Sequence, residues 1–268
     1  MDEAALRADM IEGLEHQIGE PLGASVLDAL QRVPRETFVD DTPYANRASD
    51  EAGTRALAPV TVARMLTALD AAAGDETLIV GAGIGYTAAT LAEIVGARCV
   101  HAIDIDRRAV HVARSNLAEA GYDAVLVDRR DGAHGLPEYA PYDRILLEAA
   151  VIDPPRALRE QLTAGGRVVY PKGTAVQTIV AIERDHDAPE LSARDASDAF
   201  DPELPDAPPD FRAVETAGPA RLKPMLVDGE QSDVERNRTR REDAEFAKQG
   251  YVAKHGWEQE WIDWDDRL

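Results

Sequence analysis

A short apolar run that turns through three glycines into a helical pattern constrains the fold of this chain more than any other feature. The run is Leu78 to Val80, the glycines are Gly81, Gly83 and Gly85, and helical spacing follows from Tyr86 to Val95. Because glycine has no Cβ, a nucleotide-like ligand can approach the bare backbone between such a strand and the helix N-terminus. The segment therefore predicts the first strand, loop and helix of a nucleotide-binding α/β fold.

An acid at the end of the next apolar run strengthens this prediction. Asp104 lies about twenty residues beyond the loop, where a carboxylate can accept hydrogen bonds from the hydroxyls of a ribose. The dinucleotide fingerprint requires a glycine at the sixth position of the loop, but Tyr86 stands there. The loop also has no Lys-Ser/Thr pair of the P-loop kind. A G-x-G-x-G loop followed by an acid favours S-adenosylmethionine over NAD as the ligand.

Strand and helix patterns alternate from residue 76 to residue 183, as in a doubly wound parallel sheet. The predicted strands are 77–80, 99–105, 124–127, 144–147, 167–170 and 176–183. The predicted helices between them are 86–95, 107–120 and 154–162, with Gly165-Gly166 ending the last one. Two short helices are expected within residues 3–32 and another at 60–69, with a polar, irregular stretch at 40–58.

The domain organisation follows from these patterns. Residues 1–227 form the predicted domain: a helical part at 1–75, the sheet at 76–183, an acidic, proline-rich insert at 184–210 and a return strand at 211–227. An acidic extension at 228–268 holds all three tryptophans, Trp257, Trp261 and Trp264, spaced four and three residues apart. This spacing places them on one face of a helix, which packs either on its own domain or on a partner or second copy.

The chain is strongly acidic, with 50 Asp and Glu against 29 Lys and Arg among 268 residues and a formal charge of −21. Acids spread along the whole chain favour adaptation to high salt, which screens their repulsion, over an ordinary acidic cytoplasmic protein. No arginine-rich stripe with aromatic residues indicates nucleic-acid binding. The single cysteine and the spacing of the histidines give no metal site. No signal-peptide pattern or long apolar run appears, so we expect no membrane segment and a cytoplasmic location.

Several motifs together resemble the protein-L-isoaspartate O-methyltransferase family. They are Val33-Pro-Arg-Glu-Thr-Phe-Val39, the glycine loop, Gly121-Tyr122, Asp131-Gly132, Gly135–Ile145 and Pro155–Pro171. The resemblance covers about residues 5–183 and resumes at Leu222–Leu226. It implies a Rossmann-like class I fold and methyl transfer from S-adenosylmethionine to the free carboxylate of isoaspartyl residues in damaged proteins or peptides. Because a carboxylate is already ionised at neutral pH, this reaction depends on positioning and needs no general base.

The same resemblance assigns the cofactor site residue by residue. It implies a backbone path for the methionine part of the donor along the glycine loop, ribose hydroxyls at Asp104, and adenine beside Asp131 and Gly132. Asp-Gly is also a common pair in turns, so the alternative to a contact with adenine is that Asp131 caps a turn. The expected cofactor-binding residues are Gly81, Gly83, Gly85, Tyr86, Asp104, Asp131 and Gly132.

The acceptor side departs from the family pattern. The family's Gly-Gln-Thr-Ile-Ser-Gln-Pro segment reads Gly53-Thr-Arg-Ala-Leu-Ala-Pro59 here. Leu57 at the serine position cannot donate a hydrogen bond, whereas Arg55 at the threonine position can offer a bidentate grip on a carboxylate.

A glutamate, Glu148, also replaces a threonine of the family. This acid can repel an anionic acceptor or position a cationic sulfonium. The substrate-side residues expected to be catalytic are Arg55, Thr54 and Glu148. Two alternatives remain: a family member that binds S-adenosylmethionine but has changed or lost isoaspartyl activity, and a tRNA or small-molecule methyltransferase on the same fold.

Overall fold

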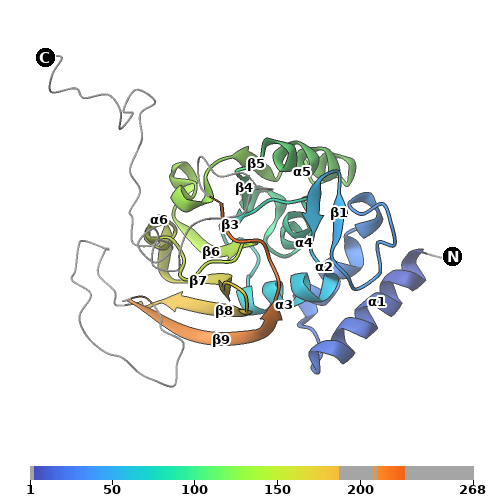
Figure 1. Cartoon of the computed structure of the whole chain (residues 1–268), viewed down its shortest axis with the longest axis horizontal. Coiled ribbons are helices and arrows are strands. Elements are labelled where there is room, and N and C mark those ends of the chain that lie inside the picture. The colour runs from blue at the N-terminus through green and yellow to red at the C-terminus, as the bar shows by residue number, and fades with distance from the viewer. Residues whose placement is uncertain (1–2, 187–207, 209, 227–268) are drawn as a thin grey trace, which may run out of the picture.

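A seven-stranded sheet with helices on both faces forms the body of the molecule (Figure 1). The computed structural model describes residues 3–186, 208 and 210–226. Their α-helices are α1 Glu3–Ile18, α2 Ala24–Arg32, α3 Pro59–Leu69, α4 Tyr86–Val95, α5 Arg107–Glu119 and α6 Arg156–Glu160. Short 3₁₀ turns are η1 Arg35–Thr37, η2 Ala97–Cys99, η3 Gly132–His134 and η4 Pro137–Tyr139. The strands are β1 Ser49–Glu51, β2 Thr54–Ala56, β3 Thr77–Val80, β4 Val100–Asp104, β5 Leu126–Arg129, β6 Tyr142–Leu147, β7 Leu162–Gly173, β8 Gln177–Arg184 and β9 Phe211–Ala220.

The strand order of the large sheet is β5-β4-β3-β6-β7-β8-β9. The first five strands in this order pair in parallel, as predicted for a doubly wound sheet. The last two pairings, β7 with β8 and β8 with β9, are antiparallel. For β7 and β8 the reason is the short connection from Gly173 to Gln177, which is a hairpin and not a crossover. The chain runs outward from β3 to β5 and then returns to β6 on the other side of β3. This reversal between β3 and β6 opens a crevice at the carboxyl ends of the strands.

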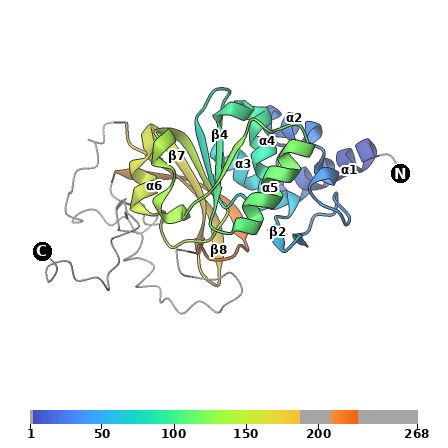
Figure 2. The same ribbon diagram turned by 90° about the horizontal axis from the view of Figure 1, so that it is seen from above.

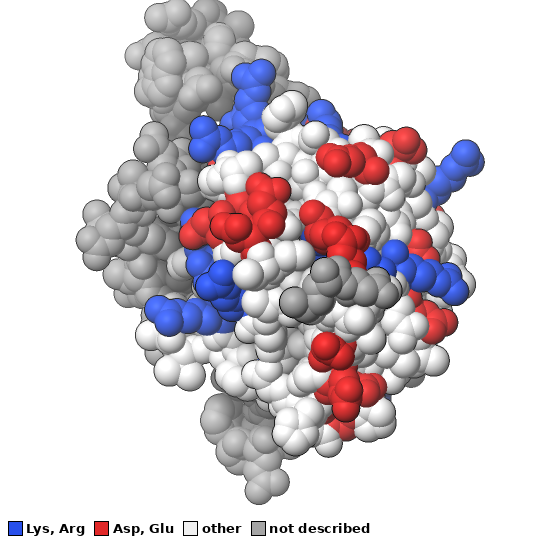
Figure 3. Space-filling view, turned by 90° about the vertical axis from the view of Figure 1, so that its right-hand side faces the viewer, with Lys and Arg blue, Asp and Glu red and all other residues white. Residues whose placement is uncertain are grey.

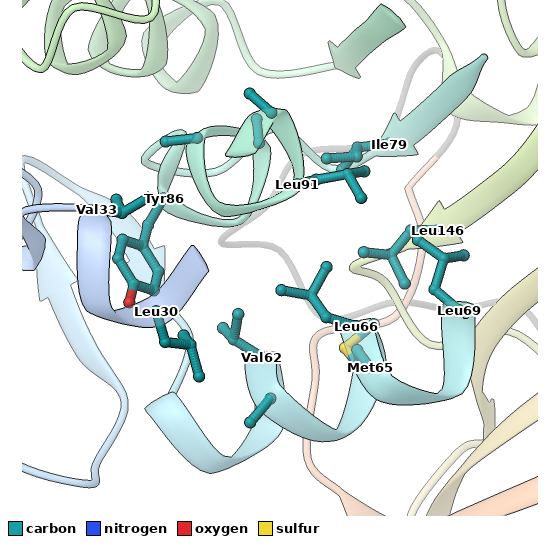
Figure 4. Close-up of a cluster of buried hydrophobic side chains, with 14 of the residues drawn as sticks. Leu30, Val33, Val62, Met65, Leu66, Leu69, Ile79, Tyr86, Leu91 and Leu146 are labelled. Carbon is teal, nitrogen blue, oxygen red and sulfur yellow. The ribbon is translucent and has the colours of Figure 1, made fainter. Parts of the chain in front are cut away.

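Two apolar clusters cover the two faces of the sheet, because successive side chains of a strand point to opposite sides. Ile79 of β3 belongs to the cluster with α1 to α5, and its neighbours Leu78 and Val80 belong to the cluster with α6. Figure 4 shows Ile79 against Leu91 of α4, and Leu146 of β6 facing α3. Helices α4 and α5 lie side by side on the same face (Figure 2).

One predicted irregular stretch contains regular structure. Within residues 40–58, strands β1 and β2 form a small antiparallel hairpin. Its two turn residues, Ala52 and Gly53, have φ values of 48° and 80°, which are the left-handed values that a two-residue hairpin turn requires. The stretch was expected to be irregular because its strands are only three residues long and alanine is an unusual residue at the first of these turn positions.

The predicted helix at 154–162 and the strand at 167–170 also need correction. Helix α6 covers only Arg156–Glu160, and β7 already begins at Leu162. Gly165-Gly166 therefore lies inside the strand and does not precede it. Leu162 pairs with Tyr142 and Arg167 with Arg144, so four residues of β7 oppose one of β6 in a bulge. Gly165 supplies the left-handed φ of 74° in this bulge.

Two sequence predictions fall on residues that the structure does not describe. The tryptophan-bearing helix expected within 228–268 and most of the insert expected at 184–210 lie outside the described residues. Any role of that helix in association therefore stays a prediction. Among the helices that are described, none is both long and apolar enough to span a bilayer.

Candidate functional site

A cleft opens at the carboxyl ends of β3, β4 and β6, where the chain reverses direction in the sheet. Its walls come from the β1–β2 hairpin, the glycine loop after β3, the segment from the end of β4 into α5, and residues 222–226 beyond β9. Segments that lie far apart in the sequence therefore meet at the switch point of the sheet.

The glycine loop and Asp104 form one hydrogen-bonded unit on this cleft. The backbone N–H of Gly83 donates to Asp104 Oδ2 at 3.1 Å, and the N–H of Asp106 donates to Oδ1 at 2.9 Å. Gly81 and Gly83 take φ values of 100° and 52°, so side chains at these two positions would strain the loop. Burial raises the pKa of Asp104 while the backbone N–H groups oppose the rise. Each carboxylate oxygen keeps a second lone pair that can accept from a ligand hydroxyl.

Three of the predicted cofactor residues, Gly85, Tyr86 and Asp131, are not among the residues that line the cleft. A Cβ at Gly85 would lie 3.2 Å from Ala113 O, so this glycine lets α5 pack closely against the start of α4. Tyr86 is buried against Phe38, with ring centroids 5.6 Å apart. Asp131 Oδ1 accepts from Ala133 N at 2.9 Å, which is the turn-capping alternative. Direct contacts of these three residues with a cofactor stay predictions.

Gly132, in contrast, lies on the cleft wall. A Cβ at this position would overlap the side chain of Val80, which also lines the cleft. The absence of a side chain here leaves room beside an apolar surface. This is the kind of surface that a flat, largely apolar base can occupy.

The predicted acceptor residues line the same cleft. Thr54, Arg55 and Leu57 come from β2 and the residues after it, and the hairpin lies over the glycine loop. A Cβ at Gly83 would be 3.5 Å from the carbonyl oxygen of Arg55, which shows how closely the two segments approach. Arg35 fixes this arrangement, because its Nη2 donates to the carbonyl of Leu57 at 2.8 Å. The structure thus brings Thr54 and Arg55 to the same cleft as Gly81, Gly83, Asp104 and Gly132.

Glu148 follows β6 and faces the glycine loop. Its N–H donates to Val80 O at 2.8 Å, which continues the pairing of β6 with β3. Its Oε1 is buried and has no hydrogen-bond partner among the described residues. Burial raises the pKa of Glu148 to about 8, and the charge of Asp104 adds to the rise, while Thr87 and Arg35 oppose it. The carboxyl group is therefore mostly neutral at pH 7.

Comparison with known proteins identifies the family. The family model described as protein-L-isoaspartate(D-aspartate) O-methyltransferase matches residues 7–200. The chain belongs to this family. A protein-L-isoaspartate O-methyltransferase of Aeropyrum pernix is 41% identical over 210 residues, which are 75% of this chain and 79% of the relative. One of Methanosarcina mazei is 39% identical over 189 residues, covering 67% of this chain and 75% of the relative.

Solved structures agree with this fold. One protein-L-isoaspartate O-methyltransferase superposes with a TM-score of 0.64 at 22% identity, covering 81% of this chain and 65% of the other. A putative one from Plasmodium falciparum, in complex with S-adenosyl-L-homocysteine, superposes with a TM-score of 0.63 at 14% identity, covering 84% and 99%. Together with the family match, they confirm the predicted fold. The family itself confirms that the chain is an S-adenosylmethionine-dependent methyltransferase.

Residues 222–226 are the part of the cleft to which the sequence analysis assigned no role. The N–H of Ala150 donates to Lys223 O at 2.8 Å, and Met225 N donates to Ala150 O at 3.0 Å, so the segment is tied to the residues after β6. Lys223 is one of only four lysines in the chain, and it lines the same cleft as Arg55. The resemblance that resumes at Leu222–Leu226 was a signal for this segment, but it assigned no role to any of its side chains.

Proposed function

We propose that this chain transfers the methyl group of S-adenosylmethionine to the free carboxylate of isoaspartyl residues in proteins or peptides, and that Arg55 binds this carboxylate. Membership of the family supports the reaction, since the relatives are named for it. One observation carries the assignment of Arg55. At the position of a family hydroxyl, it lines the same cleft as the glycine loop and Asp104.

The residues of the cleft fit the donor. Asp104 offers carboxylate oxygens to the ribose hydroxyls, and the loop at Gly81 and Gly83 offers open backbone to the amino-acid part. Gly132 beside Val80 leaves an apolar place for the base. When bound, S-adenosylmethionine supplies an electrophilic methyl group on a sulfonium. The protein has to hold the two reactants in line and exclude water.

The charges of the cleft suit an anionic acceptor. The backbone of Arg55 pairs with β1, but its side chain has no hydrogen bond or ion pair with another described residue, so the guanidinium is available for the two oxygens of a carboxylate. Lys223 supplies a second positive charge on the same cleft. In the cleft without a donor, Glu148 is mostly neutral at pH 7 and so adds no full negative charge to it. Leu57 gives an apolar wall where the family has a serine.

Replacing Arg55 by alanine tests the proposal. We expect kcat/KM for an isoaspartyl peptide to fall about tenfold or more, because a charge-assisted hydrogen bond contributes about 1.5–3 kcal/mol. The dissociation constant of S-adenosylmethionine should stay unchanged, since Arg55 lies on the acceptor side. Arg107→Ala is the matched control, because this exposed arginine of α5 is not among the lining residues.

The outcomes of this assay separate the two candidate functions. An Arg55→Ala variant as active as the wild type would show that another group binds the acceptor. A wild type that binds the donor but does not methylate the isoaspartyl peptide would favour the alternative, a family member with another acceptor or a non-catalytic, protein-binding role. Leu57 and Glu148 on the cleft are the observations that motivate this alternative.

We also propose a cytoplasmic location, a high-salt environment and an acceptor other than nucleic acid. The acidic composition, with a formal charge of −21, supports the high-salt environment and the acceptor other than nucleic acid. On the face shown in Figure 3, acidic and basic side chains are interspersed and form no continuous basic surface among the described residues. A nucleic acid would meet repulsion from much of such a surface.

Salt should therefore stabilise the protein. Raising KCl from about 0.1 M to about 1 M shortens the Debye length from about 10 Å to about 3 Å, which screens repulsion among the carboxylates. We expect the midpoint of thermal unfolding to rise by several degrees, about 2–4 °C for each kcal/mol gained. Choline chloride at the same ionic strength should give a similar rise. An unfolding midpoint that does not change with either salt would contradict salt adaptation.

A further inference from the structure

We propose that the protonation of Glu148 depends on the charge of the bound ligand. Its carboxyl group is neutral in the free site, loses its proton when the sulfonium of the donor binds, and stays protonated when the neutral thioether product binds. The inference rests on the donor part of the proposed function, and not on the identity of the methyl acceptor. It gives this residue, which replaces a threonine of the family, a role in separating substrate from product.

The position of Glu148 beside the glycine loop is the first argument. A Cβ at Gly81 would lie 3.2 Å from Glu148 Cβ, and a Cβ at Gly83 would lie 3.7 Å from Glu148 Oε2. The N–H of the same Gly83 donates to Asp104 at 3.1 Å. The carboxyl group of Glu148 and the acid assigned to the ribose therefore both lie close to Gly83.

The chemistry of the donor places its charge in this region. Its sulfur joins the ribose carbon to the methionine chain. A donor whose ribose lies on Asp104 and whose amino-acid part follows the glycine loop carries its sulfonium between these two features. Glu148 stands at that junction and lines the same cleft.

The surroundings of Glu148 explain why its carboxyl group is neutral before the donor binds. The buried Oε1 has no hydrogen-bond partner among the described residues, and an ionised oxygen in such a place is costly. Two acids share the cleft with it, and one of them, Asp104, raises the pKa further. The positive charge of Arg35 lowers the pKa of Glu148 by less than burial raises it, and the pKa rises to about 8. Asp104, Arg35 and Thr87 act directly on the carboxyl group, and the other charged or polar side chains that line the same cleft are Asp106, Thr54, Arg55 and Lys223.

A fixed positive charge at the junction reverses the balance, because an opposite charge within a few ångströms lowers the pKa of a carboxyl group. The proton of Glu148 then passes to the solvent when the sulfonium enters. Methyl transfer removes the positive charge from sulfur, and the carboxylate takes up a proton again.

This exchange of a proton determines how the affinities for the two ligands depend on pH. The affinity for S-adenosylmethionine rises with pH up to about 8, the pKa of the free site, and levels off above it, whereas the affinity for S-adenosylhomocysteine does not follow this rise.

Calorimetric titration of the full chain in two buffers with different ionisation enthalpies, phosphate and Tris, measures the protons released on binding. At pH 7 we expect S-adenosylmethionine to release about half a proton or more beyond the number released by S-adenosylhomocysteine. Glu148→Gln should abolish this difference and remove the pH dependence of the affinity ratio of the two ligands. Glu119→Gln, an exposed acid at the end of α5, should retain both.

The comparison of the two ligands on the wild type decides the matter even where the Glu148 variant does not fold. Equal proton release by S-adenosylmethionine and S-adenosylhomocysteine would overturn the inference while leaving the donor site intact. A difference that persists in Glu148→Gln would overturn it as well, because another group would then be the source of the proton. Failure of both ligands to bind would instead remove the donor site on which the inference rests.

Discussion

Replacing Arg35 by alanine should lower the free energy of unfolding by about 4 kcal/mol, because it empties a buried site and strands two carbonyl groups. Arg35 is only 1% exposed. Its Nε donates to Pro43 O and its Nη2 to Leu57 O, both at 2.8 Å, and its guanidinium lies 4.3 Å from the ring centre of Tyr86. One side chain thus ties the turn before the hairpin, the acceptor segment and the start of α4 together.

Chemical denaturation measures this loss as a lower midpoint concentration of denaturant. The dependence of the free energy of unfolding on denaturant concentration should be the same for the variant and the wild type. Arg35→Lys should be intermediate, because an ammonium keeps the charge but lacks the planar fork that reaches both carbonyls. Arg32→Ala is the matched control on the neighbouring helix. Arg32 is exposed and paired with Glu93 at 3.3 Å, so its loss should cost less than about 1 kcal/mol. Equal destabilisation by Arg32→Ala and Arg35→Ala would show that the buried hydrogen bonds are not what stabilises this region.

The elements that the sequence predicted well are those whose signals are local. Thr77–Val80 and Tyr86–Val95 have the predicted bounds, because an apolar run, glycines and a helical pattern follow each other without interruption. The hairpin and the start of β7 depend instead on pairing with distant residues. Ser49 opposes Ala56 across a turn with no turn-forming motif, and Leu162 joins β7 only because Tyr142 lies beside it. Such pairing leaves little trace in a single sequence.

The same distinction explains the site. Gly81, Gly83 and Asp104 were predicted from a motif of fixed spacing, and the structure places them on one cleft. The motif did not reveal how each member of the loop is packed: Gly85 lies against α5 and Tyr86 is buried, and neither is among the residues that line the cleft. Lys223 was missed because it reaches the cleft only through the antiparallel return of the chain along β9.

The second large effect is expected at Asp104. Asp104→Ala should raise the dissociation constant of S-adenosylmethionine about 100-fold, since two hydrogen bonds to a charged group are worth about 3 kcal/mol together. The variant also removes the acceptor for the N–H groups of Gly83 and Asp106, so the loop loses its support on the side of the ligand. Protonation of Asp104 on acidification should weaken the binding of S-adenosylmethionine. Because burial raises the pKa of Asp104, this weakening should begin at a higher pH than it would for an exposed aspartate.

Calorimetry with two further variants separates the lost contact from a collapsed loop. Asp104→Asn keeps the shape and one acceptor oxygen, so we expect a loss of about tenfold, with an unfolding midpoint close to that of the wild type. Asp123→Ala, an exposed acid beyond α5, should bind as the wild type does. If Asp104→Ala binds S-adenosylmethionine with unchanged affinity, the ribose does not lie at the end of β4. The donor would then have to enter the cleft in another orientation, and the junction between Asp104 and Glu148 would no longer hold its sulfonium.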